Sequence, residues 1–470
     1  MFTADQLIKA TKGRLFGIAG RAITGDICID SRSLMPGDIF LAIKGNNFDG
    51  HDFIVEALKR GAAAVVVHSR QSIPRLRSGQ VVHGINRTQF ILVKDTTIAL
   101  GDIARFHRNK FDIPVIAVTG SNGKTTTKEM VACLLGGSSR VLKNEGTKNN
   151  HIGLPFTLTR LDNSHDFVVL EAGTNHPGEI DYLGGICLPN IAVITNIGPA
   201  HLQYFRDLQG VYREKISLLK QMSKPQVAVF NADCSALARK AAFGRHKRKI
   251  IFGFGIKRQV DFSASDIEIG HARLRFLLNK KYRFTLRTPG YYNIYNALAA
   301  IAIARLFGIE YSDMARRLSD FSFPESRLKF RKLNNINFID DTYNSNPLSL
   351  EHALDALDKF KVRGRKIFVM GDMLELGKSE RMFHLRAGRK AAGICDCFLA
   401  VGKLSYLAAQ AAGINGFDKA RIFSCRDSLE ARDILFKEIA PRPEDIVLIK
   451  GSRSMKMEQI FKEQDERVDR

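Results

Sequence analysis

The stretch Thr119-Gly120-Ser121-Asn122-Gly123-Lys124-Thr125-Thr126 indicates how the centre of this chain folds. It follows an apolar run at residues 114–118, which is typical of a buried strand, and it opens a helical segment. This is the context of a phosphate-binding loop, where glycines let backbone N–H groups approach phosphate oxygens and a helix N-terminus adds positive potential. The spacing predicts that Lys124 contacts the β- and γ-phosphates and that Thr125 offers its hydroxyl to Mg²⁺. Val118 occupies the position of the first glycine of the full pattern, so a chance Gly-Lys-Thr turn is the alternative.

Strand-like segments continue beyond this loop and alternate with helical segments to about residue 318. They comprise Phe167–Leu170, Ile191–Ile197, Val227–Phe230 and Ile250–Phe254. This alternation predicts an α/β fold with a parallel sheet and helices on both faces. The pattern returns near the end of the chain, with strands expected at residues 336–339, 366–370, 398–401 and 446–450 and helices at 348–360 and 380–392.

Three domains are expected from this organisation. Residues 1–110 would form a small N-terminal α/β domain, and residues 111–318 a central P-loop-type parallel-sheet ATPase domain. Residues 319–470 would form a C-terminal Rossmann-like α/β domain. The segment Phe323-Pro324-Glu325-Ser326 reads as the linker and hinge between the last two.

Polar side chains follow the predicted central strands. Glu171 comes directly after one strand, and His201 follows the next. Ligands bind at the carboxyl ends of strands in an open parallel sheet, so Thr125, Glu171 and His201 are expected on one rim. A hydroxyl, a carboxylate and an imidazole suit one or two Mg²⁺ ions beside a triphosphate. Taken singly, Glu171 could be a turn carboxylate and His201 a surface histidine.

The composition is that of a globular protein, with 45% hydrophobic and 25% charged residues among 470. The formal net charge of +23 admits nucleic-acid binding, but the basic residues form no tail or aromatic-interleaved stripe. The N-terminus lacks the pattern of a signal peptide, and no apolar run approaches membrane-spanning length. The seven cysteines lack disulfide-framework or zinc-finger spacing. A cytoplasmic protein with no membrane insertion and no nucleic-acid partner is expected.

Four segments resemble the Mur ligase family, and the likeness extends over all three expected domains. Residues 120–126 resemble its ATP loop, residues 144–155 a substrate-contacting segment, residues 171–179 its Glu-x-Gly-x-Asn-x-x-Gly-Glu motif, and residues 196–202 a segment with the expected histidine. The segments Asp340–Pro347, Val369–Gly377 and Lys450–Glu458 resemble those of members that add a dipeptide. Departures occur at Thr147, Tyr292 and residues 325–326.

The resemblance implies an ATP-dependent peptide ligase of peptidoglycan precursor synthesis that works as a monomer. ATP would phosphorylate the terminal carboxylate of UDP-N-acetylmuramoyl-tripeptide, and the amine of D-alanyl-D-alanine would attack the acyl phosphate. Residues 1–110 would bind the UDP-sugar part of the substrate. Closure of the domains would exclude water from the acyl phosphate.

The resemblance also implies roles for individual residues. Lys215 aligns with a lysine that family members carbamylate, although an ordinary surface lysine is the alternative. The catalytic set would be Lys124, Glu171, His201 and Lys215, and the Mg²⁺ ligands Thr125, Glu171, His201 and Lys215. The nucleotide would be bound by Gly120, Ser121, Asn122, Gly123, Lys124, Thr125, Thr126, Asn296, Arg327, Asp341, Tyr343 and Asn344. The other substrates would be bound by Ser31, Arg32, Lys44, Gly45, Asp49, His51, Asn149, Asn150, Asn175 and His176.

Two alternatives remain at this point. One is another ligase on the same scaffold, such as a diaminopimelate- or lysine-adding enzyme or a folylpolyglutamate synthase. The other is a basic P-loop protein that binds nucleotide and nucleic acid, which predicts salt-sensitive nucleic-acid binding.

Overall fold

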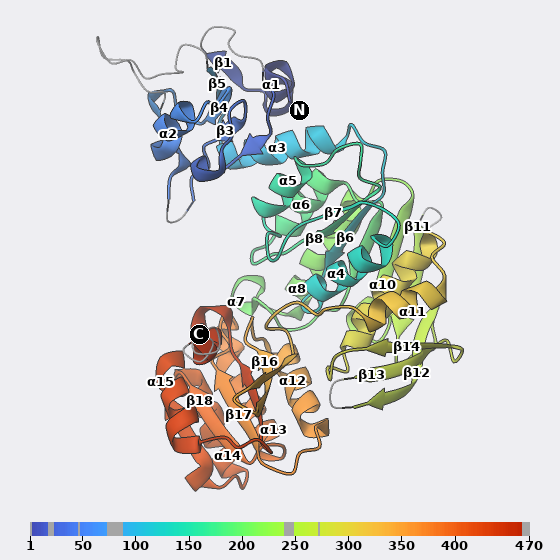
Figure 1. Cartoon of the computed structure of the whole chain (residues 1–470), viewed down its shortest axis with the longest axis vertical. Coiled ribbons are helices and arrows are strands. Elements are labelled where there is room, and N and C mark those ends of the chain that lie inside the picture. Colours follow the sequence, from blue (N-terminus) through green and yellow to red (C-terminus); the bar gives the residue numbers. More distant parts are fainter. Residues whose placement is uncertain are drawn as a thin grey trace.

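The computed structural model describes residues 2–16, 23–45, 48–72, 88–238, 249–270 and 273–462. These described residues form three β-sheets that follow one another along the chain (Figure 1). The expected α/β class with three sheet-centred regions is therefore confirmed. The boundaries predicted near residues 110 and 318 stay predictions.

The N-terminal sheet has the strand order β1-β5-β4-β3-β2. All neighbours are parallel except the edge pair β1–β5. Its elements are α1 (Ala4–Thr11), β1 (Arg14–Phe16), β2 (Ile27–Cys28), η1 (Ser31–Ser33), β3 (Ile39–Leu41), η2 (Gly50–Phe53), α2 (Ile54–Lys59), β4 (Ala64–Val67), η3 (Arg70–Ser72), β5 (Gln89–Leu92) and α3 (Thr96–Arg108).

The central sheet has the order β14-β13-β12-β11-β10-β9-β6-β8-β7. Its strands are β6 (Val115–Thr119), β7 (Val141–Lys143), β8 (Phe167–Glu171), β9 (Ile191–Ile194), β10 (Gln226–Asn231), β11 (Lys249–Gly255), β12 (Phe262–Ile269), β13 (Leu274–Leu278) and β14 (Tyr282–Leu286). Strands β6 to β11 pair in parallel, which puts their carboxyl ends on one edge.

The alternation expected up to residue 318 is wrong for residues 262–286. There, β12, β13 and β14 follow one another without helices and pair antiparallel. The physical reason is their pattern of side chains: β13 alternates buried and exposed residues, so only one of its faces packs on the core. A fully buried parallel strand, such as β6, is apolar on both faces.

Helices cover both faces of the central sheet: α4 (Lys124–Leu135), α5 (Gly153–Leu158), α6 (Glu179–Cys187), α7 (Leu202–Phe205), α8 (Leu208–Ser217), η5 (Leu218–Gln221), α10 (Asn293–Leu306) and α11 (Tyr311–Ser319). Helices α4 and α10 pack together on one face. Helix α10 is apolar on all sides because it is buried between this sheet and α4. Helix α3 packs against α5 and α6 and so attaches the N-terminal region to the central one (Figure 1).

The C-terminal sheet has the order β15-β16-β20-β17-β18-β19 and is parallel apart from its edge pair β15–β16. Its strands are β15 (Lys329–Leu333), β16 (Ile336–Asp341), β17 (Lys366–Gly371), β18 (Cys397–Val401), β19 (Ile422–Cys425) and β20 (Ile446–Lys450). Its helices are α12 (Pro347–Lys359), η6 (Gly377–Ser379), α13 (Glu380–Ala392), α14 (Lys403–Ile414), η7 (Lys419–Arg421), α15 (Ser428–Asp433), η8 (Ile434–Ile439), η9 (Arg453–Met455) and η10 (Met457–Phe461).

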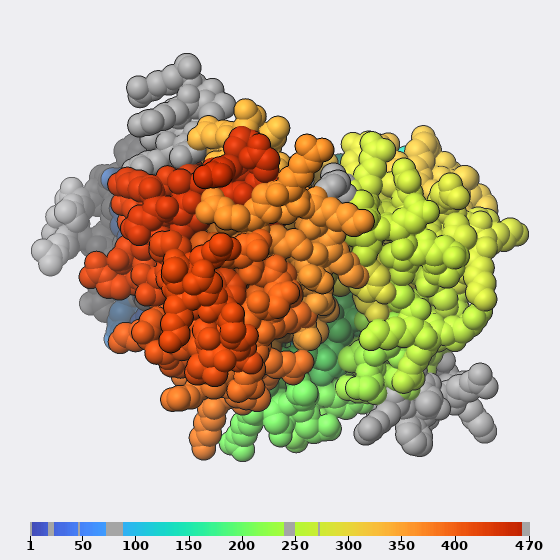
Figure 2. All heavy atoms as spheres, turned by 90° about the horizontal axis from the view of Figure 1, so that it is seen from below, coloured from blue at the N-terminus to red at the C-terminus, as the bar shows by residue number. Residues whose placement is uncertain are grey.

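A loop joins α11 of the central region to β15 of the C-terminal region and contains the expected linker. Seen from below, the orange and red C-terminal residues lie beside the green and yellow central residues (Figure 2). Residues that follow β6 and β9 contact loops of the C-terminal sheet: Asn122 bonds to Asn346, and His201 bonds to Glu375. Within the described part of the chain, no helix is long and apolar enough to cross a membrane.

Candidate active site

The loop predicted to bind phosphate connects β6 to the first turn of α4. Gly120 has φ +145° and Gly123 has φ +80°, which side-chain-bearing residues rarely adopt. A side chain at Gly120 would collide with Thr195, and one at Gly123 with Asn296. Both glycines are therefore required by the backbone and by the space around it.

Residues after β9 hold this loop in shape. Thr195 Oγ1 donates to the carbonyl of Asn122 at 2.5 Å, and Asn196 Oδ1 accepts from the Asn122 N–H at 2.9 Å. The strand expected to reach Ile197 ends at Ile194 because the next residues turn to make these bonds. Tertiary bonding to the loop thus overrides their β-branched pattern.

Glu171 ends β8 and is joined to the phosphate loop. Its Oε2 accepts from Thr125 Oγ1 at 2.6 Å, and its Oε1 accepts from Asn149 Nδ2 at 2.6 Å. Asn144 fixes the Glu171 backbone by accepting from its N–H at 2.9 Å and donating to its carbonyl at 3.0 Å. The carboxylate is 1% exposed, so its orientation is set by these bonds. The hydroxyl and carboxylate expected on one rim are therefore in contact.

Two lysines lie near the loop, of which Lys124 is half-buried and Lys215 is buried. Lys124 Nζ donates to the carbonyls of Gly120 and Ser121, at 3.0 and 3.3 Å. Lys215, on α8, is 2% exposed, and among the described residues its ammonium has no hydrogen bond or ion pair. Burial lowers the pKa of both lysines, and that of Lys215 falls well below its ordinary value, with the charge of Lys124 adding to the effect. Lys215 is thus not the surface lysine of the alternative interpretation.

Glu214, the neighbour of Lys215, supports the helix α6. It accepts from the backbone N–H groups of Gly178 and Ile180, each at 2.7 Å. Glu179 likewise accepts from the N–H groups of Asn175 and His176. Both carboxylates therefore shape the loop after β8.

His201 lies between the central and C-terminal regions. Its Nδ1 is 2.5 Å from Glu375 Oε2, and the N–H of Gln203 donates to the Glu375 carbonyl at 3.0 Å. The bond from His201 lowers the pKa of the Glu375 carboxyl. Sequence reasoning missed Glu375, and the only signal for it was its position in the segment Val369–Gly377.

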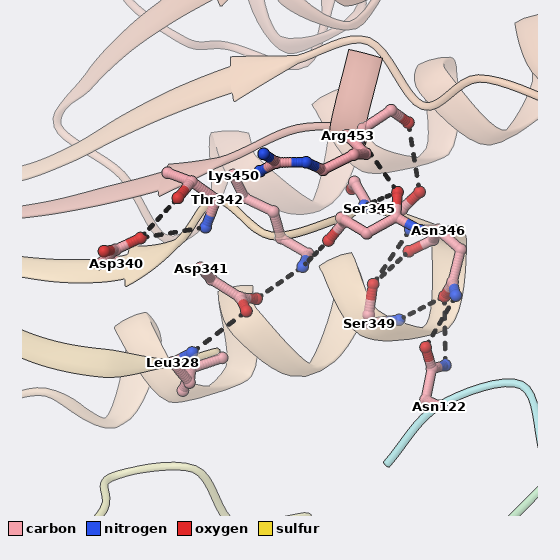
Figure 3. Close-up of polar contacts among 12 residues, drawn as sticks. Asn122, Leu328, Asp340, Asp341, Thr342, Ser345, Asn346, Ser349, Lys450 and Arg453 are labelled. Carbon is pink, nitrogen blue, oxygen red and sulfur yellow. Dashed lines mark hydrogen bonds and ion pairs between the residues drawn. The ribbon is translucent and has the colours of Figure 1, made fainter. Parts of the chain in front are cut away.

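A second contact joins the phosphate loop to the C-terminal region (Figure 3). Asn122 Nδ2 donates to Asn346 Oδ1 at 3.2 Å, and Asn346 Nδ2 donates to Asn122 Oδ1 at 2.7 Å. Asn346 is also the N-cap of α12, where its Oδ1 accepts from the Ser349 N–H at 2.9 Å. Sequence reasoning missed Asn346, although Asn-Pro is a typical helix start.

Asp341 and Lys450 form a buried ion pair beside this contact (Figure 3). Lys450 Nζ lies 2.6 Å from Asp341 Oδ2 and donates to the Asn344 carbonyl at 2.8 Å. The Leu328 N–H donates to the other Asp341 oxygen at 3.1 Å. Burial raises the pKa of Asp341 although Lys450 opposes that shift. The pair ties β16 to β20 and to the loop that carries Asn344.

Aromatic side chains and the guanidinium of Arg327 lie where the linker enters the C-terminal region. The Arg327 guanidinium lies 3.9 Å from the centre of the Tyr343 ring. Tyr292, at the start of α10, stacks on His352 of α12 with ring centres 4.8 Å apart. Asn296 is buried deeper, where it accepts from Thr127 Oγ1 at 3.2 Å.

A cavity of about 400 Å³ lies between the two regions and is lined by many of these groups. Among the residues singled out from the sequence, its walls contain Ser121, Asn122, Gly123, Lys124, Thr126, Asn149, Asn150, Glu171, Asn175, His201, Arg327, Asp341, Tyr343 and Asn344. Gly120, Thr125, Asn296, Lys215 and His176 lie outside its lining. In the described part of the chain, no group of three or more His, Cys, Asp or Glu residues could hold a metal ion.

The N-terminal candidates lie away from this cavity and bond locally. Ser31 Oγ donates to Glu56 at 2.9 Å, Arg32 pairs with Asp30, and His51 Nδ1 lies 2.6 Å from Asp49 Oδ1. Lys44 and Gly45 are exposed.

A larger, mostly apolar cavity of about 730 Å³ lies between the same two regions. Its walls include Pro199, Leu202, Pro347, Leu350 and Phe383. Several of these residues are sequence neighbours of residues that line the smaller cavity, such as His201 and Asn346. His201 and Asn346, with the residues that they contact, therefore lie between the two cavities.

Known proteins match the chain along its length. Three family models match: the Mur ligase family catalytic domain at residues 25–108, the Mur ligase middle domain at 118–304 and the Mur ligase glutamate ligase domain at 326–453. A relative in Bacillus subtilis (strain 168), UDP-N-acetylmuramoyl-tripeptide–D-alanyl-D-alanine ligase, is 34% identical over 93% of this chain and 92% of its own. A crystal structure of MurF from Acinetobacter baumannii has a TM-score of 0.86 at 32% identity and covers 99% of both chains. MurF ligase from Thermotoga maritima in complex with ADP has a TM-score of 0.79 at 27% identity, over 95% of this chain and 98% of its own. The chain belongs to the Mur ligase family.

Proposed function

We propose that the chain is an ATP-dependent ligase that joins D-alanyl-D-alanine to UDP-N-acetylmuramoyl-tripeptide through an acyl phosphate, in peptidoglycan precursor synthesis. The observation that carries this proposal is the match along the whole chain with relatives named for this reaction. The bond from Thr125 of the phosphate loop to Glu171 at the end of β8 adds a hydroxyl and a carboxylate suited to such a reaction.

ATP would bind with its phosphates against the loop Gly120–Thr126. The two positive-φ glycines leave the backbone open to a phosphate, and the N-terminus of α4 adds positive potential. Among the described residues, the hydrogen-bond partners of the Lys124 ammonium are loop carbonyls, which it can exchange for phosphate oxygens. Asn296, Arg327, Asp341, Tyr343 and Asn344 would contact or support the rest of the nucleotide.

The residues present fit Mg²⁺. Glu171 offers a buried carboxylate beside the Thr125 hydroxyl, and Mg²⁺ prefers such oxygen ligands. Thr125 and Glu171 would hold one ion, and His201 and Lys215 a second. When bound, the ions would neutralise charge on the transferring phosphoryl group.

Lys215 would take part as a carbamate. A buried lysine with a lowered pKa has more neutral amine, which attacks CO₂ and loses a proton to form an anionic oxygen ligand. Exact mass should show the modification, and Lys215→Ala should regain activity with added short-chain acids. A fully active, unmodified Lys215→Ala enzyme would contradict this role.

The remaining substrate would span the N-terminal and central regions. Residues 1–110 would bind its UDP-sugar part through Ser31, Arg32, Lys44, Gly45, Asp49 and His51. Asn149, Asn150, Asn175 and His176 would contact the peptide, since three of these four line the cavity. Residues 111–318 would bind ATP, and residues 319–470 would complete the ligase site.

We infer a cytoplasmic monomer. All seven cysteines are free, as is typical of a reducing compartment.

Phosphate release from ATP tests the proposed reaction. It should require both a UDP-muramoyl tripeptide and D-alanyl-D-alanine. For comparison, the same release is measured with a UDP-muramoyl dipeptide and either diaminopimelate or lysine as the amine. If phosphate release requires diaminopimelate or lysine and is not stimulated by D-alanyl-D-alanine, the proposed specificity is wrong, although the ligase reaction still holds.

A further inference from the structure

Glu375 reaches His201 from the other side of the cavity. It follows β17 in the C-terminal region, whereas His201 follows β9 in the central region. Besides the 2.5 Å contact of the side chains, the Gln203 N–H donates to the Glu375 carbonyl. Gly377 packs closely on the Gln203 backbone. The loop of Glu375 is therefore docked by its backbone as well as by its carboxylate.

The backbone of both partners is in the left-handed region. His201 has φ +53° and Glu375 has φ +64°, and neither is a glycine. Such conformations are unfavourable for side-chain-bearing residues, and they persist where surrounding contacts hold them, commonly at functional sites. Here the two residues with positive φ contact each other through their side chains.

The contact also selects the tautomer of His201. An ionised carboxylate can only accept, so when the imidazole is neutral its proton lies on Nδ1. Nε2 then carries the lone pair, and among the described residues it has no hydrogen-bond partner. His201, Glu375 and Glu171 all line the same cavity. A carboxylate that orients a histidine in this way is typical of metal sites.

We propose that Glu375 is a positioning residue that holds His201 with Nε2 ready to bind the second Mg²⁺. Because Glu375 belongs to the C-terminal region, this nitrogen is oriented only when that region lies against the central one. The inference rests on the proposed function, in which His201 is a ligand of that ion.

Mn²⁺ binding to the full chain with a non-hydrolysable ATP analogue tests the proposal, with free Mn²⁺ counted by electron paramagnetic resonance. Glu375→Ala should weaken the second Mn²⁺ about 10- to 100-fold and leave the first unchanged. Glu375→Gln should lose less, because its amide oxygen still accepts from Nδ1. Glu430→Ala is the matched control: it removes a carboxylate of α15 that pairs with Arg426 inside the C-terminal region, and it should leave the second Mn²⁺ affinity unchanged.

Further variants separate this inference from the proposed function. Glu375→Ala added to His201→Asn should cause no further loss, because Glu375 acts through His201. A second Mn²⁺ that binds normally to Glu375→Ala but weakly to His201→Asn overturns the positioning role alone. Normal binding to both variants overturns the proposed role of His201 as well.

The tautomer is a readout independent of metal and activity. With ¹⁵N-labelled histidine and His201→Asn for assignment, nuclear magnetic resonance should find the His201 proton on Nδ1 in the wild-type chain. In Glu375→Ala the proton should be distributed over both nitrogens. A proton on Nε2 in the wild-type chain would overturn the inference, whatever the number of Mn²⁺ ions bound.

Discussion

The two sides of the 400 Å³ cavity are built in different ways. On the central side, Thr125, Glu171 and Asn149 bond to one another at the carboxyl end of a single sheet. On the C-terminal side, Asn346 and Glu375 have their partners in the other region, 224 and 174 residues away in the sequence. The bonds of Thr125, Glu171 and Asn149 form within the central region, whereas those of Asn346 and Glu375 form only where the two regions meet.

This difference predicts which property of the enzyme each side of the cavity should control. Groups held ready within one sheet can stabilise charge during the reaction without reorganising. Groups that cross between two regions depend on how those regions are placed. Changes on the central side should therefore reduce the rate most, and changes on the C-terminal side should affect stability and site assembly.

Lys124→Met should have the largest effect. Removing a preorganised cation beside the phosphates should lower the rate of phosphate release about 10³-fold, because charge would develop there without compensation. Lys220→Met, which changes an exposed lysine of the same region, should keep the wild-type rate. A similar loss in both variants would mean that general basic charge matters more than the loop.

Glu171→Gln should lower phosphate release about 10²-fold. The amide keeps the shape of the side chain but removes the negative charge that Mg²⁺ would need. Raising the Mg²⁺ concentration should recover part of the rate. Glu268→Gln, at an exposed carboxylate of β12, is the control and should show no such Mg²⁺ dependence.

Lys450→Met should affect stability more than any other change on the C-terminal side. It leaves the buried Asp341 without its partner, which should lower the free energy of unfolding by about 3 kcal/mol. Adding Asp341→Asn should restore part of that loss, since the unpaired charge is removed as well. Denaturant unfolding measures both variants, and equal losses would exclude the buried charge as the cause.

Asn346→Ala should have the smallest effect, about 1 kcal/mol on unfolding, because α12 loses its N-cap. Asn346→Ser keeps a capping oxygen but cannot reproduce the amide pair with Asn122. Both variants should raise the KM for ATP, and only Ala should lower stability. An unchanged KM in both would show that the contact with the phosphate loop does not support ATP binding.

The sequence predicted the central side better than the rest because its signals are local. The phosphate loop is a contiguous motif between a strand and a helix, and Glu171 directly follows an apolar strand. The likeness to Mur ligases came from such segments and is confirmed by matches along the chain. The antiparallel strands β12–β14 were missed because short apolar runs do not reveal which strands pair.

By itself, the sequence determined the α/β class, the family and the residue types of the phosphate rim, since each depends on neighbours within a few positions. Only the tertiary structure decided that Asn346 meets Asn122, that Glu375 meets His201, and that Lys215 is buried without a partner among the described residues. These contacts join parts of the chain that no local pattern relates. Hydrogen bonding and burial depend on how close atoms lie in space, and only the packing of the two sheets sets those distances.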